Sequence, residues 1–532
     1  MHIGSTRIAG KTLRIPAVVV TSLALALGPA LAQSLPVQLG PTPSEDVMPM
    51  AANGLTLGLA ALPGYVSDIM QRSAVPGVAV AVVHGGETVF SQGFGVRRLG
   101  DPAPVDPTTV FQVASVSKSI SATIAAIQVT KGVVSWNDPV SSRLPGFALS
   151  DPYVSAHATI GDFFAHRTGL PFAAGDELED LGFSRSDILA RLSQLPLDSF
   201  RTSYHYANFS TTTAAEAVAA ASGQAWEDLA QDVLYKPLGM TSTSSRHADY
   251  LARPNRAVLH ALVDGRFQPL YDRDPDAQAP AGGVSSNVVD LAEWLKLLLG
   301  VGHAPRQPNI AAKDLQPAIT AQSFSSPAHA ADARSGFYGY GFNVGVNPNG
   351  RTGMGHSGAF LLGAGTYFQI LPSADIGIVV LTNGSPVGAA ESIAAQFMDT
   401  VQYGAPIRDW YPLYNGLMQA YYNPEGDLAG EQPPANPQAP KPFDSYVGEF
   451  RNPFFGTATV RTDGQQLSIA LGPRPTVFPL VSWDGDTFAM TPSGENAPAG
   501  SKSTVRFAMQ NGVATGFTIN FYDANGLGTW QR

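Results

Sequence analysis

Ser115 and Lys118 combine two side chains that could carry out acyl transfer. They lie three residues apart in FQVASVSKSISA, so on a helix both side chains would share one face. A serine hydroxyl becomes an effective nucleophile only when a base removes its proton. Lysine can be that base when burial or nearby positive charge lowers its pKa. The pair predicts a nucleophile at a helix start, where the Ser115 N–H would be free to stabilise an oxyanion. An amphipathic helix with one lysine would show the same four residues.

Tyr206 and Asn208, inside SYHYANFS, could serve the same centre. A tyrosine near Ser115 could accept its proton as a phenolate, or relay a proton to a leaving group. The Asn208 amide could bind a substrate carbonyl and hold Lys118 in place. Taken alone, this motif is better explained as a loop with a packed tyrosine and a turn asparagine.

His356-Ser357-Gly358, inside GMGHSGAFLLGAGTYF, precedes a predicted strand pair and is expected to open a strand. Gly358 would let the backbone approach a substrate closely, and the N–H of Ala359 could be a second oxyanion donor. His356 could hydrogen-bond the tyrosine or the substrate, although a lone histidine in a glycine-rich turn is more simply a surface loop. Residues 355–359 also approach the G-x-S-x-G elbow of α/β-hydrolases, with Ser357 as nucleophile. Ala359 breaks that pattern, and no histidine follows His356 as that fold requires.

Composition narrows the classes of function. The 532 residues include 32 Lys and Arg against 42 Asp and Glu, a net charge of −10, and show no basic run, so nucleic-acid binding is not indicated. The absence of cysteine excludes disulfides, thiolate nucleophiles and cysteine-based metal sites. The ten histidines show no HExxH spacing, and we expect neither a metal nor a cofactor.

Hydrophobic patterning predicts a mixed α/β or α+β domain rather than a doubly wound one, because a helix is followed by antiparallel strands. The expected helices are residues 55–70, 119–130, 211–222 and 290–299, and the expected strands are 78–83, 88–90, 365–371 and 376–382. Beyond residue 442, short alternating stretches separated by turns predict a small all-β barrel or sandwich.

The three motifs, in this order, resemble the penicillin-recognising serine hydrolases, whose pattern is S-x-x-K, Y-x-N and [KH]-x-G. That group comprises class C β-lactamases, D-Ala-D-Ala carboxypeptidases, D-aminopeptidases and related esterases. VPGVAVAVV and PAGGVSSNVVDLAEWLKLLL are similar to the same family, and the resemblance spans roughly residues 55–419. The tail from Tyr446 resembles a lipocalin-like domain. The resemblance implies a β-lactamase/transpeptidase-like α/β domain, with a central antiparallel sheet flanked by helices, and a small all-β C-terminal barrel.

The resemblance also implies roles. Ser115 would be acylated, Lys118 and Tyr206 would share the acid–base work in an order that stays open, and His356 would replace the lysine of many β-lactamases. The implied catalytic residues are Ser115, Lys118, Tyr206 and His356, and the implied substrate-binding and oxyanion residues are Asn208, Ser357, Gly358 and Ala359.

The expected domains follow from composition together with this resemblance. The N-terminal basic residues, an apolar run over 15–27 and the Ala30-Leu31-Ala32 site predict a signal peptide, with a membrane anchor as the alternative. The expected segments are 1–32, a signal peptide cleaved after Ala32; 33–54, a flexible lead-in; 55–422, the hydrolase domain; 423–442, a proline-rich linker; and 443–532, the lipocalin-like β domain.

The function implied is that of a periplasmic or secreted serine peptidase or amidohydrolase acting through an acyl-enzyme. Its substrates would be short linear peptides, including D-residue-containing or non-ribosomal ones such as linearised cyclic peptides. A carboxylesterase or a β-lactamase of the same fold is the alternative, and the histidine in the third motif disfavours the β-lactamase. A receptor that is acylated without turnover is a further class. The expected partner is a small peptide or ester, without nucleic acid or a stable membrane span, and a homo-oligomer is open.

Overall fold

A computed structural model describes residues 49–301, 308–347 and 349–532. The predicted signal peptide and most of the predicted lead-in lie outside the described residues. The described residues belong to one compact unit that contains both the sheet and the barrel described below. Across the described ranges, no helix combines the length and apolar character that a membrane crossing needs.

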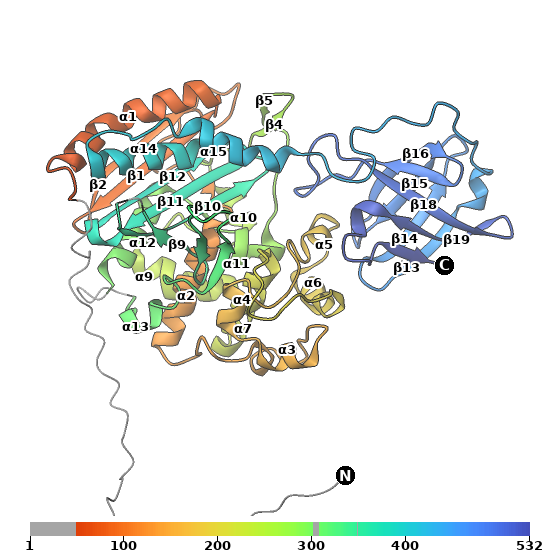
Figure 1. The fold of residues 1–532 in the computed structure, drawn as a ribbon, viewed down its shortest axis with the longest axis horizontal. Coiled ribbons are helices and arrows are strands. Elements are labelled where there is room, and N and C mark those ends of the chain that lie inside the picture. The colour runs from red at the N-terminus through yellow and green to blue at the C-terminus, as the bar shows by residue number, and fades with distance from the viewer. Residues whose placement is uncertain (1–48, 302–307, 348) are drawn as a thin grey trace, which may run out of the picture. The chain divides into compact units, whose positions relative to one another are not determined.

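An eight-stranded sheet, antiparallel at every pairing, forms the centre of the larger domain (Figure 1). Its order is β2-β1-β12-β11-β10-β9-β8-β7. The strands are β1 (Gly77–His84), β2 (Glu87–Gly95), β7 (Ser323–Ser326), β8 (Gly336–Tyr338), β9 (Asn343–Val346), β10 (Thr352–Phe360), β11 (Ala364–Leu371) and β12 (Ile376–Thr382). The antiparallel sheet expected from the sequence is confirmed.

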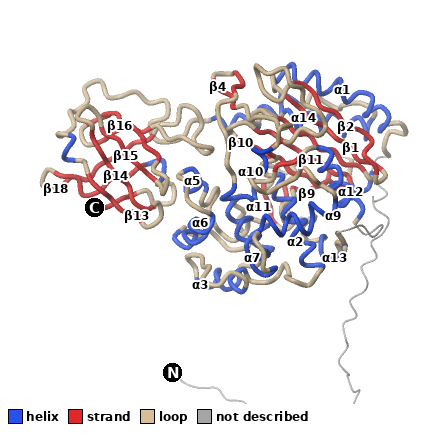
Figure 2. Tube along the Cα trace, turned by 180° about the vertical axis from the view of Figure 1, so that it is seen from behind, coloured by secondary structure: helices blue, strands red, loops and turns tan. Residues whose placement is uncertain are grey.

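Helices cover both faces of this sheet, as Figures 1 and 2 show from opposite sides. Val78, Val80 and Val82 belong to a core shared with α1 (Gly54–Ser73) and α14 (Ala389–Tyr403). The intervening Ala79, Ala81 and Val83 belong to the core of the other face, together with α2 (Val116–Thr130) and α12 (Val288–Gly300). Successive side chains of a strand point to opposite faces, so burial on both faces explains the unbroken apolar run VAVAVV.

The remaining helices lie mainly on the α2 side. They are α3 (Pro152–His157), α4 (Ile160–Phe164), α5 (Asp176–Asp180), α6 (Arg185–Arg191), α7 (Asn208–Ser222), α8 (Trp226–Ala230), α9 (Lys236–Leu238), α10 (His247–Ala252), α11 (Ala279–Gly282) and α13 (Ala312–Leu315), while α15 (Tyr411–Met418) follows α14. Two small sheets pair β3 (Phe111–Gln112) with β6 (Ser285–Ser286), and β4 (Ala261–Val263) with β5 (Arg266–Gln268).

Three expected helices begin two or three residues earlier than the sequence patterns placed them. Helices α2, α7 and α12 start at Val116, Asn208 and Val288 rather than at residues 119, 211 and 290. Their first turns contain polar residues that interrupt the apolar pattern. In α12, for example, the Asn287 side chain accepts a hydrogen bond from the Asp290 N–H at 2.8 Å and caps the helix.

The C-terminal residues form a closed barrel in which neighbouring strands are antiparallel and follow sequence order. Its strands are β13 (Gly448–Asn452), β14 (Gly456–Thr462), β15 (Leu467–Leu471), β16 (Thr476–Asp484), β17 (Thr487–Met490), β18 (Ser503–Gln510), β19 (Val513–Ile519) and β20 (Thr529–Gln531). Aromatic side chains fill its interior, as in the stacked rings of Phe517 and Trp530, whose centroids are 5.3 Å apart. The small all-β barrel expected at the C-terminus is confirmed.

Only part of the proline-rich segment 423–442 is exposed. Leu428 is buried, and Asp427 accepts hydrogen bonds from the backbone and side chain of Thr504 at 2.8 and 2.7 Å. Residues 431–439, by contrast, are exposed. The first part of this segment therefore belongs to the surface of the barrel, while the domain boundaries taken from composition stay a prediction.

Candidate active site

Ser115 is the N-cap residue of α2, and its side chain is partly exposed. The residue before it, Ala114, has a left-handed backbone with φ of 48°. An alanine rarely adopts this conformation, because its Cβ crowds the carbonyl group. This turn places the hydroxyl of Ser115 at the N-terminus of α2, which is the positive end of the helix dipole.

Lys118 lies one turn further along α2 and is completely buried. Its Nζ donates to Ser115 Oγ at 3.2 Å, to Asn208 Oδ1 at 2.6 Å and to the carbonyl of Ala281 at 3.1 Å. Burial lowers the pKa of Lys118 to about 7, against the opposing attraction of nearby carboxyl groups. Near neutral pH the amine is therefore available as a proton acceptor beside the serine.

Tyr206 and Asn208 approach from the start of α7. The Tyr206 ring centroid is 4.6 Å from Lys118 Nζ. Burial raises the pKa of Tyr206 well above its ordinary value, although a hydrogen bond with Ser115 works in the opposite direction. The phenol is therefore protonated at neutral pH. The Asn208 amide accepts from Lys118 and donates to Asp176 Oδ2 at 2.9 Å, which fixes its orientation.

Strand β10 brings His356 to the same side of the sheet. Its Nε2 accepts a hydrogen bond from the Tyr338 hydroxyl at 2.8 Å, and its Nδ1 donates to the carbonyl of Ser357 at 2.5 Å. Burial, followed by the charge of Lys118, lowers the pKa of His356 to about 3, so the ring is neutral. The tyrosine hydroxyl that hydrogen-bonds His356 is that of Tyr338, not that of Tyr206. The ring centroids of Tyr206 and His356 are 6.2 Å apart.

Gly358 lies directly against the turn that carries the nucleophile. A Cβ at this position would be 3.2 Å from Ser115 N, and closer still to Val113 O and Thr366 Oγ1. Any other residue would push β10 away from α2, so glycine allows the close approach. The backbone of Ala359 follows immediately, at the place proposed for the second oxyanion donor.

Ser357 points to the opposite face of the sheet from His356 and Gly358, because side chains alternate along a strand. Its hydroxyl hydrogen-bonds the buried Glu391 in the first turn of α14 and thereby lowers the pKa of that carboxyl, which burial raises. The structure thus brings Ser115, Lys118, Tyr206 and Asn208 together with His356, and places the Ser357 side chain away from them.

Two functional features were missed by sequence reasoning. Tyr338 lies in YGYGF and carries no distinctive sequence signal. The acidic run DELED, which forms α5, was not assigned to the site from the sequence. Asp176 holds Asn208, and burial together with Glu179 raises the pKa of Asp176 well above its ordinary value. Four acidic residues within five positions repel one another, and this unfavourable cluster is a sequence signal that could have drawn attention to α5.

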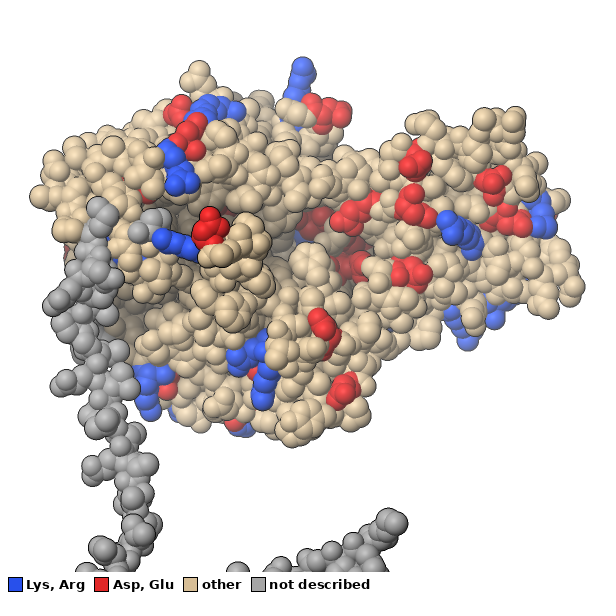
Figure 3. Space-filling model, viewed as in Figure 1, with Lys and Arg blue, Asp and Glu red and all other residues tan. Residues whose placement is uncertain are grey.

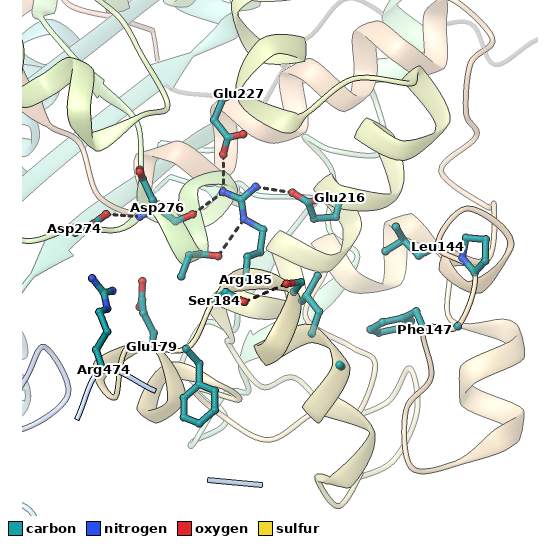
Figure 4. A pocket seen from close by; sticks show the side chains of 18 residues that line it. Leu144, Phe147, Glu179, Ser184, Arg185, Glu216, Glu227, Asp274, Asp276 and Arg474 are labelled. Atoms are coloured by element: carbon teal, nitrogen blue, oxygen red, sulfur yellow. Dashed lines mark hydrogen bonds and ion pairs between the residues drawn. The ribbon is translucent and has the colours of Figure 1, made fainter. Parts of the chain in front are cut away.

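A cavity of about 990 Å³ lies next to α5 and α6 and is lined by acidic and basic side chains (Figure 4). Arg185 pairs there with Glu216 at 2.7 Å and Glu227 at 2.5 Å, and Glu179 pairs with Arg273 at 2.7 Å (Figure 4 shows Arg185, Glu216, Glu227 and Glu179). Acidic side chains also gather where the barrel meets the larger domain on the face in Figure 3. The residues around Ser115 do not line this cavity. The described parts of the chain contain no group of acidic and histidine side chains able to hold a metal ion.

The sequence and the fold are similar to those of known proteins. The Beta-lactamase family matches residues 62–402, and a domain of unknown function, DUF3471, matches residues 432–527. The chain is 26% identical over 421 residues to unguisins hydrolase ungD' of Aspergillus campestris, covering 75% of this chain and 77% of that protein. It is 29% identical over 383 residues to penicillin-binding protein 4 of Amycolatopsis lactamdurans, covering 70% and 91%.

Further relatives extend the comparison. The chain is 24% identical to the D-alanyl-D-alanine-carboxypeptidase/endopeptidase AmpH of Escherichia coli K12, covering 64% of this chain and 89% of that protein. The octameric penicillin-binding protein homologue from Pyrococcus abyssi has the same fold, with a TM-score of 0.56 at 18% identity over 89% of this chain and 99% of that one. A class C β-lactamase from Rhodobacter sphaeroides has a TM-score of 0.52 at 23% identity, covering 64% and 98%.

Proposed function

Because the chain belongs to the Beta-lactamase family and is a serine hydrolase, we propose that it forms an acyl-enzyme on Ser115 and cleaves short linear peptides. The observation that carries this proposal is the 3.2 Å contact between Lys118 Nζ and Ser115 Oγ, in a buried site that lowers the pKa of the lysine to about 7. A nucleophile, a base of suitable pKa and a helix N-terminus meet at one point.

The reaction would proceed in two steps. Ser115 Oγ attacks the substrate carbonyl while Lys118 takes the hydroxyl proton, and the N–H groups of Ser115 and Ala359 stabilise the oxyanion. The proton then passes to the leaving amine from Lys118 or through the Tyr206 phenol, which is protonated. A water molecule hydrolyses the acyl-enzyme by the same path in reverse. Of the two candidate bases, Lys118 is the better first acceptor, because burial moves its pKa toward neutrality and that of Tyr206 away from it.

The substrate class rests on the third motif and on the relatives. The AmpH relative is named a D-alanyl-D-alanine-carboxypeptidase/endopeptidase, which supports peptides that contain D-residues. The relative named a hydrolase of unguisins supports extension to non-ribosomal peptides, such as linearised cyclic ones. The neutral His356 stands where many β-lactamases carry lysine. A carboxylesterase or β-lactamase activity is the alternative, because an acyl-serine can be formed from either an ester or an amide.

Labelling with a phosphonate that reacts with activated serine residues tests whether Ser115 is the nucleophile. Intact-protein mass should show one adduct, mapped to Ser115, in the wild type and in Ser357→Ala, and none in Ser115→Ala. An adduct that survives in Ser115→Ala would refute the assignment. Matched ester, D-amide and L-amide substrates then distinguish the activities, with kcat/KM for the D- or L-amides expected to match or exceed that for the ester. A large preference for the ester would favour the carboxylesterase.

Export, with cleavage after Ala32, is part of the proposal and rests on the sequence alone. The N-terminal sequence of the mature protein recovered from the producing cells tests it. Homo-oligomerisation is also proposed, and the Pyrococcus abyssi relative is described as octameric. Light scattering of the purified protein gives the oligomeric state directly.

A further inference from the structure

A loop of the barrel reaches the strand pair that carries the third motif. The loop lies between β17 and β18, and its Glu495 side chain is 14% exposed. Glu495 Oε1 accepts a hydrogen bond from the Leu361 N–H at 2.5 Å, and Oε2 accepts from the Leu362 N–H at 3.3 Å. These two N–H groups belong to the turn between β10 and β11, which begins two residues after Ala359. One carboxyl group from the C-terminal domain thus binds the end of strand β10, and burial raises the pKa of this group to about 8.

The same loop also clamps the acidic helix α5. The backbone N–H groups of Glu495 and Asn496 donate to the two oxygens of Asp180 at 3.1 and 2.9 Å, and Asn496 Nδ2 donates to Asp180 Oδ2 at 3.0 Å. Gly494 has φ of 132°, and a Cβ there would meet the Asp180 carboxyl at about 2.5 Å. This glycine lets the loop lie flat against the carboxylate.

A buried arginine closes the network. Arg273 Nη2 pairs with Glu179 Oε2 at 2.7 Å, and its Nε lies 3.9 Å from Glu495 Oε2. The side chains of Arg273 and Glu179 are 7% and 4% exposed. Such a pair is held in place because separating it would leave an uncompensated buried charge. Arg273 therefore anchors Glu495 to the helix whose first residue, Asp176, orients the Asn208 amide.

We propose that Glu495 is a positioning residue of the Ser115 site, through which the barrel holds β10 and α5 in place around the nucleophile. This inference rests on the proposed function of Ser115. Glu495 does not touch the reacting atoms. It acts through the strand that carries His356 and Gly358 and through the helix behind Asn208. Misplacing such groups by about 1 Å is enough to lower a rate about 100-fold.

Substitution of Glu495 tests the proposal. Glu495→Gln keeps the shape and one acceptor oxygen but replaces the other oxygen by an amide NH2, which cannot accept a hydrogen bond from the Leu361 or Leu362 N–H. Asn496→Ala loosens the clamp on Asp180 without changing α5. The matched control is Glu449→Gln on β13, because Glu449 is 58% exposed and is paired only loosely with Arg451 at 3.7 Å. The measurements are the rate constant for phosphonate acylation of Ser115, kcat and KM on one peptide substrate, and the thermal unfolding midpoint.

We expect Glu495→Gln to lower the acylation rate constant and kcat about 10- to 100-fold with a smaller change in KM. Asn496→Ala should lower both in the same direction, and Glu449→Gln should match the wild type. The rate constant is measured per reactive site, so a variant that is merely less stable would show fewer labelled molecules at an unchanged rate constant, and that result would overturn the positioning role. Absence of a Ser115 adduct in the wild type would instead refute the proposed function itself.

Discussion

The pH dependence of Ser115 acylation should follow the titration of Lys118. Burial lowers the pKa of this amine from 10.5 to about 7. The difference of about 3.5 pKa units corresponds to about 5 kcal/mol of differential interaction between the charged and neutral amine. At pH 7 about half of the molecules would carry a neutral Lys118, compared with about one in 3,000 for an exposed lysine. The structure thus predicts a base that is ready in the free protein.

The assay is the rate of acylation by an uncharged phosphonate between about pH 5 and pH 9. The rate should rise about tenfold per pH unit below the midpoint and level off above about pH 7. Lys118→Arg places a group that stays protonated beside Ser115, and should lower the plateau rate about 10²- to 10⁴-fold. A flat profile, or a rate that still rises about tenfold per pH unit at about pH 9, would refute Lys118 as the first base.

The pH dependence of the unfolding free energy is a second measure of the lowered pKa of Lys118. The folded pKa lies below the unfolded one, so between about pH 7 and pH 10.5 the unfolded chain binds more protons than the native protein. Native stability arising from this group therefore increases as pH rises through that window. In Lys118→Met this increase should disappear, which comparison of unfolding midpoints at the two ends of the window would reveal.

Two further substitutions probe the strand that carries His356. Tyr338→Phe removes the donor to the buried Nε2 of that ring, which should cost about 1–3 kcal/mol of unfolding free energy and lower kcat; urea unfolding and steady-state kinetics measure both, and unchanged kcat would show that the hydroxyl does not orient the ring. Gly358→Ala places a Cβ 3.2 Å from Ser115 N and should slow Ser115 acylation about 100-fold. Acylation at the wild-type rate would mean that β10 can retreat without disturbing the nucleophile.

Local patterns in the sequence were sufficient for the parts of the fold that are themselves local. The apolar run at 78–83, the turn that follows it and the pair 365–371 and 376–382 predicted β1, β2, β11 and β12. Strands β1 and β12 can be recognised within a few residues, because two buried faces require an unbroken apolar run, whereas the largely exposed β2 was recognised from the turn that precedes it. Helix starts were placed too late because capping and first-turn residues are polar and look like loop.

The residues of the site also fall into two groups, those recognisable from local sequence and those that depend on distant contacts. Its three motifs are short and could be read from residue types and order, and their side chains meet except for Ser357. The residues that hold them could not be read, since their meaning depends on distant contacts. The Tyr338 hydroxyl matters because β8 and β9 bring it to His356, and Glu495 matters because it meets the turn at Leu361. No periodicity or propensity connects residues 134 positions apart in the chain.

The pairing of β1 with β12 has a consequence for how the protein acquires its structure. Val78 lies opposite Thr382, and His84 opposite Ile376, so the centre of the sheet joins segments about 300 residues apart. Closing so long a loop is slow, and the early apolar strand must wait for its partner to be synthesised. Until then β1 can pair only with β2, which follows it in the chain, so the edge that later meets β12 is unpaired and apolar side chains on its faces stay uncovered. Folding yield, rather than native stability, is therefore where substitutions in residues 78–83 should first become visible.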